Sequence, residues 1–484
     1  MSDEILTLQP SSLWKYFFEI TQIPRPSKHE EKIIEYLENF AKNNNLDYSK
    51  DEIRNIVIRK KATTGYENAP DVCLQSHVDM VCEKHSNIEI DFLNDPINPY
   101  IDGDFIKAKG TTLGADNGIG MAIQLAILAD SSLQHGNLEC LFTVDEETGL
   151  TGAFELGKDM LKSEILINLD SEDDGEFFIG CAGGAETTGY IDIETENVSE
   201  DYSFFKISVF GLKGGHSGDD IHKGHGNANK ILNRFLWEQQ NNLNLKLSLF
   251  DGGNLRNAIA REAFAIAGVP DDKVENLKEL LTKYSDIVKK ELFVTDNGVD
   301  IAIEKTGKPN FVFTENLQKR LLNLIYVIPH GVIAWSQDIP NFVETSTNLA
   351  SVKILDDKIK IVTSQRSSVE SAKNNICQCV AAAFELADAK YEHGSSYPGW
   401  TPNPQSYILE VAKRAYKKLF GAEPVVRAIH AGLECGLFTE KYPDIDIISI
   451  GPDIKGAHSP DERLSISSTQ RFWKLTLDIL KKIK

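Results

Sequence analysis

Two short motifs of the sequence combine side chains that can bind metal ions. In Ser76-His77-Val78-Asp79, an imidazole and a carboxylate stand two residues apart, so both point to the same side of an extended segment. Asp116 lies in a glycine-rich turn, residues 114–120, directly before an apolar run. A histidine nitrogen binds a divalent ion well, and a nearby carboxylate can orient the other ring nitrogen. The spacing therefore predicts a metal centre that includes His77 and Asp116, with Asp79 orienting the histidine.

A pair of neighbouring glutamates, Glu146 and Glu147, follows the apolar run 140–144 and precedes Thr-Gly. In a metal site one such carboxylate can bind the ion while the other acts as a general base on water. We assign Glu147 as the ligand and Glu146 as the general base.

Two more candidate ligands also follow apolar runs. Asp170 is the first acid after the run 165–169, which favours it over the acids at 172–174. His458 lies between Gly-Ala and Ser-Pro in a loop after the run 445–450, so its backbone positions the side chain. Two histidines and three carboxylates, one of them shared, suit two divalent ions about 3.5–4 Å apart. Zinc fits this donor set, and manganese and cobalt are alternatives.

Strands and helices alternate up to about residue 180, which predicts an α/β domain with a mostly parallel sheet and covering helices. The predicted strands include 71–76, 138–144 and 165–169, and the predicted helices include 11–23, 28–43, 119–129 and one near 151–161. Ligands of such sheets bind beyond the carboxyl ends of the strands. The histidines and carboxylates named above follow predicted strands at that end.

The pattern changes near residue 187 and predicts an inserted α+β domain that extends to 392. Its predicted strands include 204–210, 258–267 and 358–363, and its predicted helices include 227–241, 272–291 and 369–386. A segment rich in Pro and Gly, 392–404, predicts a crossing between domains. The first domain is therefore expected to comprise 1–186 and 393–484, with 187–392 inserted into it.

Composition limits the partners and the location. The formal net charge of −21 argues against nucleic acid or an anionic membrane as a partner. The start of the chain has no secretory signal pattern, and no uncharged apolar run is long enough to predict a transmembrane helix. The 7 cysteines show no CxxC spacing, so we expect a reducing, cytoplasmic location.

The motifs together resemble the M20 family of co-catalytic metallopeptidases. Four longer segments are closest to its cytosolic non-specific dipeptidases, which include the aminoacyl-histidine (Xaa-His) dipeptidases: 74–81, 109–121, 180–184 and 429–438. The resemblance extends over nearly the full length. It implies an α/β catalytic domain of zinc-peptidase type with an inserted lid. It also implies hydrolysis of dipeptides that have free amino and carboxyl termini, including carnosine-type Xaa-His dipeptides.

The resemblance also implies how two metal ions are held. His77 and Asp170 are expected on one ion, and Glu147 and His458 on the other, although the two ions can be exchanged in this assignment. Asp116 is expected to bridge them.

Further roles come from the resemblance within the insert. His216, in Gly-Gly-His-Ser-Gly, resembles the lid histidine that stabilises the oxyanion, and His222 and His225 are close alternatives. Asn257 and Arg366 resemble lid positions that hold the carboxylate of the substrate, for which arginine suits bidentate pairing.

Two residues near the end of the chain have open interpretations. Glu434 is a candidate to hold the free α-amino group, or is simply an acid at a helix N-terminus. His430 faces the ligand or packs in the interior.

Other functions are compatible with the same motifs. An N-acyl amino-acid deacylase or an aminotripeptidase would use the same metals, and a non-catalytic relative is a further alternative. A nucleotide-binding oxidoreductase is disfavoured because the GxGxxG spacing is absent. The sequence leaves open whether the chain is a monomer or a homodimer.

Overall fold

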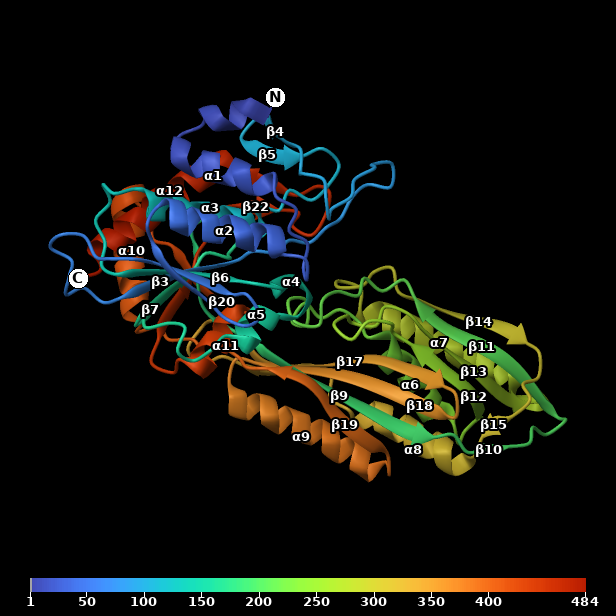
Figure 1. Ribbon diagram of the computed structural model, residues 1–484. Coiled ribbons are helices and arrows are strands. Elements are labelled where there is room, and N and C mark those ends of the chain that lie inside the picture. The colour runs from blue at the N-terminus through green and yellow to red at the C-terminus, as the bar shows by residue number, and fades with distance from the viewer. Residues whose placement is uncertain (1) are drawn as a thin grey trace. The chain divides into compact units, whose positions relative to one another are not determined.

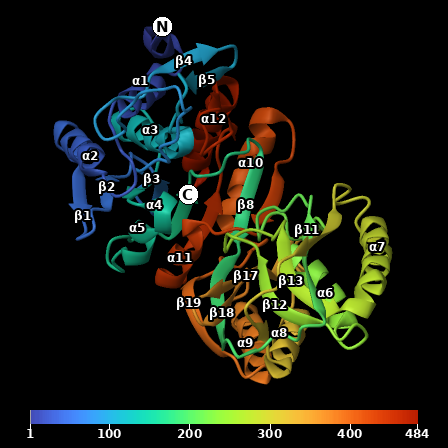
Figure 2. The ribbon, with the colours of Figure 1, turned by 90° about the vertical axis from the view of Figure 1, so that its right-hand side faces the viewer.

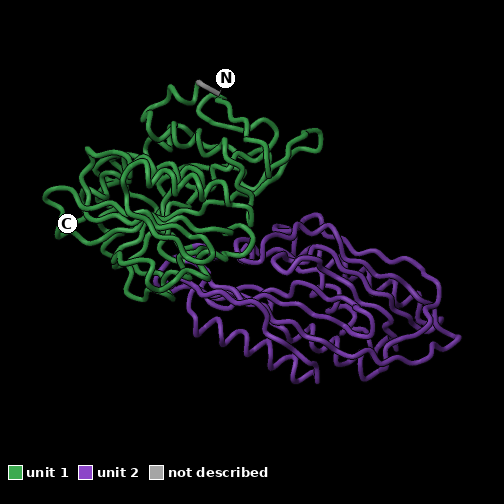
Figure 3. Tube along the Cα trace, viewed as in Figure 1, with its two compact units in different colours: residues 1–180, 402–428, 433–484 green, residues 181–401, 429–432 purple. Residues whose placement is uncertain are grey.

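The computed structural model describes residues 2–484 and divides into two compact units (Figure 3). Unit 1 comprises the chain up to Gly180 together with Pro402–Ala428 and Leu433–Lys484. Unit 2 comprises Cys181–Thr401 and the short segment Ile429–Gly432. In the described part of the chain, no helix has the length and apolar character needed to cross a membrane.

An eight-stranded sheet forms the centre of unit 1, in the order β1-β2-β6-β3-β7-β21-β8-β20. The bounds are β1 (Asp47–Lys50), β2 (Ile56–Lys60), β3 (Val72–His77), β6 (Leu138–Thr143), β7 (Ile165–Asn168), β8 (Glu176–Cys181), β20 (Val425–Ile429) and β21 (Asp446–Ser449). Strands β6, β3, β7 and β21 run parallel, whereas β2 pairs with β6 and β8 with β21 in antiparallel fashion. Every residue of β3, β6 and β7 is buried, which explains the apolar runs that predicted them.

Helices cover this sheet within unit 1. Helices α1 and α3 pack together, α3 lies against β3, and α10 packs against both α12 and β21 (Figure 1). The bounds are η1 (Ser2–Thr7), α1 (Ser11–Thr21), α2 (Glu31–Asn43), α3 (Ala115–Ala129), α4 (Glu146–Gly149), α5 (Thr151–Glu155), α10 (Tyr407–Phe420), α11 (Glu434–Lys441) and α12 (Ile466–Lys482).

The bounds of two of these helices compare differently with the prediction. Helix α3 spans Ala115–Ala129, but Asp116 and Asn117 have non-helical dihedral angles, so its regular part follows the glycine-rich turn, close to the predicted 119–129; Gly114 before it is left-handed (φ 68°). The helix predicted near 151–161 is limited to α5, which ends before the helix-weakening Gly157.

A four-stranded sheet of unit 1 supports the loop that carries His458. Its order is β22-β23-β5-β4, with β22 (Ile454–Lys455), β23 (Arg463–Ser465), β5 (Phe105–Ala108) and β4 (Pro99–Asp102). The loop joins β22 to β23, which pair with each other, and β23 also pairs with β5. Strand pairing therefore fixes both ends of the His458 loop.

Unit 2 is built on a nine-stranded sheet with antiparallel pairs (Figure 2). The order is β14-β11-β13-β12-β17-β18-β9-β19, and β16 also pairs with β17. The bounds are β9 (Gly183–Asp192), β11 (Tyr202–Phe210), β12 (Lys246–Gly252), β13 (Ala263–Pro270), β14 (Asp300–Thr306), β16 (Gly331–Trp335), β17 (Val343–Leu355), β18 (Lys358–Ser367) and β19 (Lys390–Tyr397). Two short strands, β10 (Thr195–Glu196) and β15 (Val312–Phe313), form a separate pair.

Four helices of unit 2 share one apolar core with this sheet: α6 (Ala228–Gln239), α7 (Val274–Glu291), α8 (Glu315–Val327) and α9 (Glu370–Leu386). The short η2 (Asp271–Lys273) precedes α7. Helix α9 lies along β9 and β18, and α6 lies against β11 and β13 (Figure 1). Alternate residues of β11, Phe205, Ile207 and Val209, point into this core, as the period of a strand requires. The arrangement agrees with the predicted α+β insert.

The predicted domain boundaries at 186 and 392 differ from the boundaries of the units. Residue 186 lies inside β9 and residue 392 inside β19, and these strands pair side by side in unit 2. The Pro- and Gly-rich composition of 392–404 therefore conceals an edge strand at its start. Because β9 and β19 pair with each other, both strands belong wholly to unit 2, and its boundaries lie after residues 180 and 401. Residues 429–432 also belong to unit 2.

Candidate active site

The predicted ligands of unit 1 lie at the carboxyl ends of adjacent parallel strands. His77 is the last residue of β3, and Asp170 follows β7. Glu146 and Glu147 begin helix α4, shortly after β6. Because β6, β3 and β7 are neighbours in the sheet, these side chains meet at one edge.

Asp116, in the first turn of α3, lies at the centre of the cluster. Its Oδ1 is 2.9 Å from Nε2 of His77, and its Oδ2 is 3.2 Å from Nε2 of His458. Oδ1 of Asp170 lies 3.3 Å from Nε2 of His77, and Oε2 of Glu147 lies 3.0 Å from Nε2 of His458. Each half of the cluster thus has one imidazole and one carboxylate of its own, and Asp116 faces both halves.

The donor atoms of this cluster suit divalent metal ions. They form three overlapping groups whose atoms lie within 4.8 Å of one another: His77, Asp116 and Asp170; Asp116, Glu147 and His458; His77, Glu146 and Glu147. In addition, Oε1 of Glu147 is buried and has no hydrogen-bond partner among the described residues. A buried carboxylate oxygen without a donor is costly, and a bound cation would remove that cost. The residues present therefore fit the predicted pair of metal ions.

The histidines of the cluster experience a strong negative potential. Hydrogen bonds to Asp116 and Glu147 raise the pKa of His458 to about 11. Burial opposes protonation of His77, but Asp170 and Asp116 still raise its pKa well above the usual value. A potential that holds protons this firmly also attracts divalent cations.

Asp79 contacts both His77 and the backbone amides of the two glutamates, and so fixes their positions relative to one another. Its Oδ1 lies 3.3 Å from Nδ1 of His77 and accepts a hydrogen bond from the backbone N–H of Glu146 (3.1 Å). Its Oδ2 accepts from the backbone N–H of Glu147 (3.2 Å) and from the hydroxyl of Ser27 (2.7 Å). Burial raises the pKa of Glu146 well above its usual value, although His77 opposes this shift.

Glu434, the first residue of α11, is buried with 1% of its surface exposed, and its carboxylate interacts electrostatically with His77 and Asp170. Its Oε2 accepts hydrogen bonds from Nε2 of Gln75 (2.7 Å) and from the hydroxyl of Thr143 (3.0 Å). Its Oε1 has no hydrogen-bond partner in residues 2–484. Burial raises the pKa of Glu434 to about 8, so a nearby cationic group would stabilise its ionised form.

In unit 2, the predicted residue Arg366 is the centre of a second polar cluster. Its Nη1 donates to the hydroxyl of Tyr397 (2.9 Å), and its Nη2 lies 3.3 Å from Nε2 of His216. Its Nε lacks a hydrogen-bond partner among the described residues. Arg366 is only 8% exposed, and His216, together with the charge of Arg366, lowers the pKa of Asp219. Because a buried donor without an acceptor is costly, this guanidinium is suited to an anionic ligand.

The loop around His216 fixes this side chain through backbone groups. The backbone N–H of His216 donates to Oδ2 of Asp220 (2.7 Å). The amides of Gly218 and Asp219 lie 3.3 and 3.2 Å from Nδ1 of the same histidine. This leaves Nε2 as the ring atom that faces Arg366.

The structure does not link the other candidates of this region to Arg366 by any hydrogen bond or ion pair among the described residues. The ring of His222 packs edge-on against an aromatic ring, and His225 is hydrogen-bonded to a backbone carbonyl. Asn257 is exposed, and its carbonyl accepts a hydrogen bond from the loop of His216 (2.8 Å). This hydrogen bond to the loop therefore comes from the backbone of Asn257 and not from its side chain.

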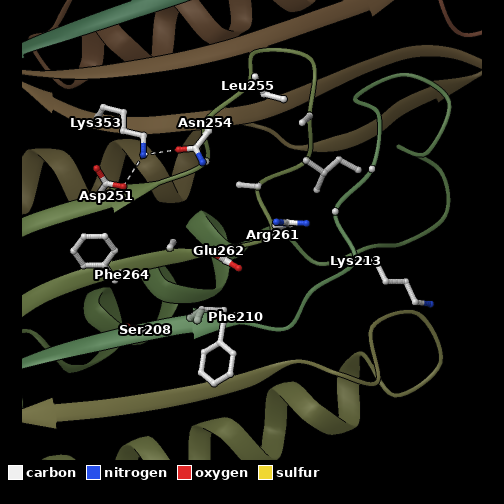
Figure 4. A pocket seen from close by; sticks show the side chains of 18 of the residues that line it. Ser208, Phe210, Lys213, Asp251, Asn254, Leu255, Arg261, Glu262, Phe264 and Lys353 are labelled. Carbon is white, nitrogen blue, oxygen red and sulfur yellow. Dashed lines mark hydrogen bonds and ion pairs between the residues drawn. The ribbon is translucent and has the colours of Figure 1, made fainter. Parts of the chain in front are cut away.

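A cavity of about 860 Å³ opens over β11, β12 and β13 (Figure 4). Both His216 and Asn257 are among the residues that line it. Lys213 and Arg261 also line it, and Lys353 is paired with an aspartate at its edge. The volume is in the range that admits small ligands.

His430, in the short segment that belongs to unit 2, is buried and hydrogen-bonded. Its Nε2 lies 2.7 Å from the hydroxyl of Ser346, and burial together with the charge of Arg366 lowers its pKa to about 3. The neutral imidazole is therefore fixed close to the guanidinium.

Three residues that form hydrogen bonds with the predicted side chains could not be recognised as functional from the sequence. Ser27 supports Asp79, Gln75 supports Glu434, and Tyr397 supports Arg366. Ser27 and Gln75 lie beside or within the motifs, whereas Tyr397 lies in a segment that reads as a crossing between domains.

Comparison with known proteins agrees with this geometry. Residues 73–482 match the sequence profile of peptidase family M20/M25/M40. The matched region includes every predicted metal ligand of unit 1. The chain belongs to this family. Its α/β fold is therefore that of the M20 peptidases, as the motifs predicted.

Within the M20 family, the chain is similar over its whole length to two dipeptidases. It is 44% identical over 480 residues to the cytosol non-specific dipeptidase of Escherichia coli (strain K12), covering 99% of both chains. The crystal structure of aminoacylhistidine dipeptidase from Vibrio alginolyticus matches with a TM-score of 0.95 and 42% identity, covering 100% of this chain and 99% of that one. A tripeptidase from Staphylococcus aureus, 17% identical with a TM-score of 0.58, shares the fold over 98% of this chain and 99% of its own.

Proposed function

We propose that this M20 protein is a metallo-dipeptidase that cleaves the peptide bond of dipeptides with free amino and carboxyl termini. Xaa-His dipeptides are included among its proposed substrates, and intracellular peptide degradation is its proposed role. The whole-length similarity to two dipeptidases supports this proposal. The observation that carries it is the position of Asp116, whose two oxygens face two different imidazoles.

The proposed centre holds two divalent ions, for which zinc is our first choice and manganese and cobalt are alternatives. His77 and Asp170 are assigned to one ion, Glu147 and His458 to the other, and Asp116 to both. When bound, such ions supply a water of lowered pKa and polarise the scissile carbonyl.

The general base is proposed to be Glu146. It would take a proton from the attacking water and return it to the leaving amine, and its raised pKa suits a group that must both accept and donate. Asp79 would keep His77 and Glu146 aligned through the contacts described above. His216 is proposed to stabilise the negative charge that develops on the carbonyl oxygen.

Selectivity for dipeptides would follow from recognition of both termini. Arg366 is proposed to bind the substrate carboxylate, with His430 and Asn257 as further contacts. Glu434 is proposed to hold the free α-amino group, because one of its buried oxygens lacks a donor. A cytoplasmic location is also proposed, since the Escherichia coli relative with whole-length similarity is named a cytosol dipeptidase.

The reaction class can be tested with a small substrate panel: β-Ala-His, Leu-Gly, a tripeptide and an N-acetyl amino acid, each with and without a chelator. We expect chelator-sensitive cleavage of the two dipeptides alone. Cleavage of only the acetylated substrate would support an N-acyl amino-acid deacylase instead, and cleavage of only the tripeptide would support an aminotripeptidase.

Replacement of Arg366 by methionine is expected to lower kcat/KM for dipeptides by about 10²- to 10³-fold, because a buried charge pair with the substrate carboxylate is lost. The same variant should no longer prefer a dipeptide over its C-terminal amide, whereas the unmodified protein should prefer the free acid strongly. The ratio of kcat/KM for the acid and the amide measures this preference. Arg256→Met, which removes an exposed arginine of the same unit, is the matched control.

A further inference from the structure

The carboxylate of Glu462 accepts hydrogen bonds from four consecutive backbone amides. Its Oε2 lies 2.6 Å from the amide nitrogen of Leu113 and 3.0 Å from that of Gly114. Its Oε1 lies 2.7 Å from the amide nitrogen of Ala115 and 3.3 Å from that of Asp116. Glu462 is 2% exposed, so these amides are its substitutes for water. One side chain thus fixes the backbone that carries the central carboxylate of the cluster.

Glu462 also belongs to the loop that carries His458. Its own amide donates to the carbonyl of Ser459 (3.1 Å), and the next residue, Arg463, begins β23. Strand β23 is held by pairing with β22 and β5. The Glu462 carboxylate is therefore a rigid link between the His458 loop and the turn of Asp116.

A second buried side chain, that of Arg25, connects the turn of Asp116 with the segment that follows β3. Arg25, 1% exposed, donates from Nη1 to the carbonyls of Val78 (2.8 Å) and Asp79 (2.5 Å) and from Nη2 to the carbonyl of Gly114. Gly114 is thus held by Glu462 through its amide and by Arg25 through its carbonyl. A Cβ at Gly114 would lie 2.6 Å from Nη2 of Arg25, so this position has no room for a side chain.

We propose that Glu462 is a positioning residue of the metal centre, and this inference rests on the proposed function. Asp116 must present one oxygen to each half of the centre, so its backbone must keep a fixed distance from the loop of His458. Glu462 sets this distance, because its carboxylate joins the two backbones directly. It contacts neither ion nor substrate in this proposal, and it acts through Asp116 and His458.

Stabilisation of the N-terminus of α3 is the simpler role for the same contacts, since carboxylates favour helix N-termini. The two roles predict different results for Glu462→Gln. Glutamine keeps the size of the side chain but offers one acceptor oxygen and turns an N–H₂ group towards two amides that need acceptors. If Glu462 only stabilises the helix, this variant should melt at a lower temperature but bind metal normally while folded.

The test compares Glu462→Gln with the unmodified protein and with Asp461→Asn, an exposed neighbour in the same loop. Metal-free protein is titrated with Zn²⁺ in competition with a chromophoric chelator, and hydrogen exchange of residues 113–116 is measured before metal is added. We expect affinity for at least one of the two ions to fall about 10- to 100-fold. We also expect at least tenfold faster exchange of these amides, a lower kcat and a nearly unchanged KM. Asp461→Asn should behave like the unmodified protein.

Metal affinities and kcat equal to those of the unmodified protein, in a folded Glu462→Gln variant, would overturn the positioning role. If that variant does not fold, Glu462→Asp provides the same test, because it keeps the charge and withdraws the oxygens by one methylene. It should show a smaller loss of affinity, and wild-type affinity in this variant would also contradict the proposal. Failure of the unmodified protein itself to bind divalent ions would instead refute the proposed function, so the two failures are distinguishable.

Discussion

The variant Glu146→Ala is expected to lose about 10²- to 10⁴-fold in kcat for dipeptide hydrolysis while it still binds two divalent ions. The reason is that Glu146 is assigned the proton transfers and no metal contact, whereas its neighbour Glu147 lies 3.0 Å from His458. The measurement combines kcat on a dipeptide with the metal content of the purified variant. Together they separate the loss of a base from the loss of an ion.

Glu155→Ala is a suitable control for this experiment, because Glu155 is an exposed acid at the end of α5, in the same stretch of chain. Its activity should equal that of the unmodified protein. Full activity of Glu146→Ala would show that another group removes the proton. A loss of metal together with activity would show that Glu146 is itself a ligand, as its place in one of the donor groups permits.

The proximity of the candidate ligands could be predicted from sequence because they follow recognisable local patterns. His77 ends one apolar segment, Glu147 and Asp170 come within a few residues of the ends of two others, and all three segments become fully buried parallel strands. Neighbouring parallel strands have their carboxyl ends at the same edge of the sheet. The residues that follow them can therefore be expected to lie close together even when no distance is known. The sequence could not show that the two oxygens of Asp116 point to different imidazoles, since this depends on the orientation of one side chain.

The supporting residues could not be predicted because their contacts span long stretches of chain. Glu462 bonds to amides that lie 346 to 349 residues earlier, and Arg25 bonds to a carbonyl 89 residues later. No hydrophobic period or spacing links such partners. In the sequence, Glu462 is one of two neighbouring acids after His458, and Arg25 lies between two prolines, so neither position indicates a role at the site.

The limits of unit 2 differ from the predicted domain bounds for a related reason. Glycine, serine and proline near 392–404 predict a loop, and composition cannot show that 390–397 finds a partner in β9. Strand identity at a sheet edge depends on the neighbouring strand, so it appears only with the tertiary structure. The polar cluster around Arg366 depends on the same strand, because Tyr397 is the last residue of β19.

Replacement of Asp116 by asparagine is expected to abolish detectable hydrolysis and to weaken binding of both ions rather than one. Asparagine has nearly the same shape, but its N–H₂ group cannot bind a cation, and one negative charge is lost from between two imidazoles. The measurement is metal stoichiometry and affinity by calorimetry, together with kcat on a dipeptide. Far-ultraviolet circular dichroism should remain unchanged, because the backbone amide of Asp116 is still held by Glu462.

The number of ions affected is the decisive result for Asp116. Asp170 lies 3.3 Å from His77, and Glu147 lies 3.0 Å from His458, so Asp170→Asn and Glu147→Gln should each weaken one ion more than the other. If a variant of Asp116 showed a weaker affinity for only one ion, Asp116 would be a ligand of that ion alone, and its proposed bridging role would be wrong. Asp130→Asn, at the opposite end of α3, should bind both ions normally and so exclude a general effect on the helix. Equal loss at both ions, seen only for Asp116, is the result that a shared carboxylate requires.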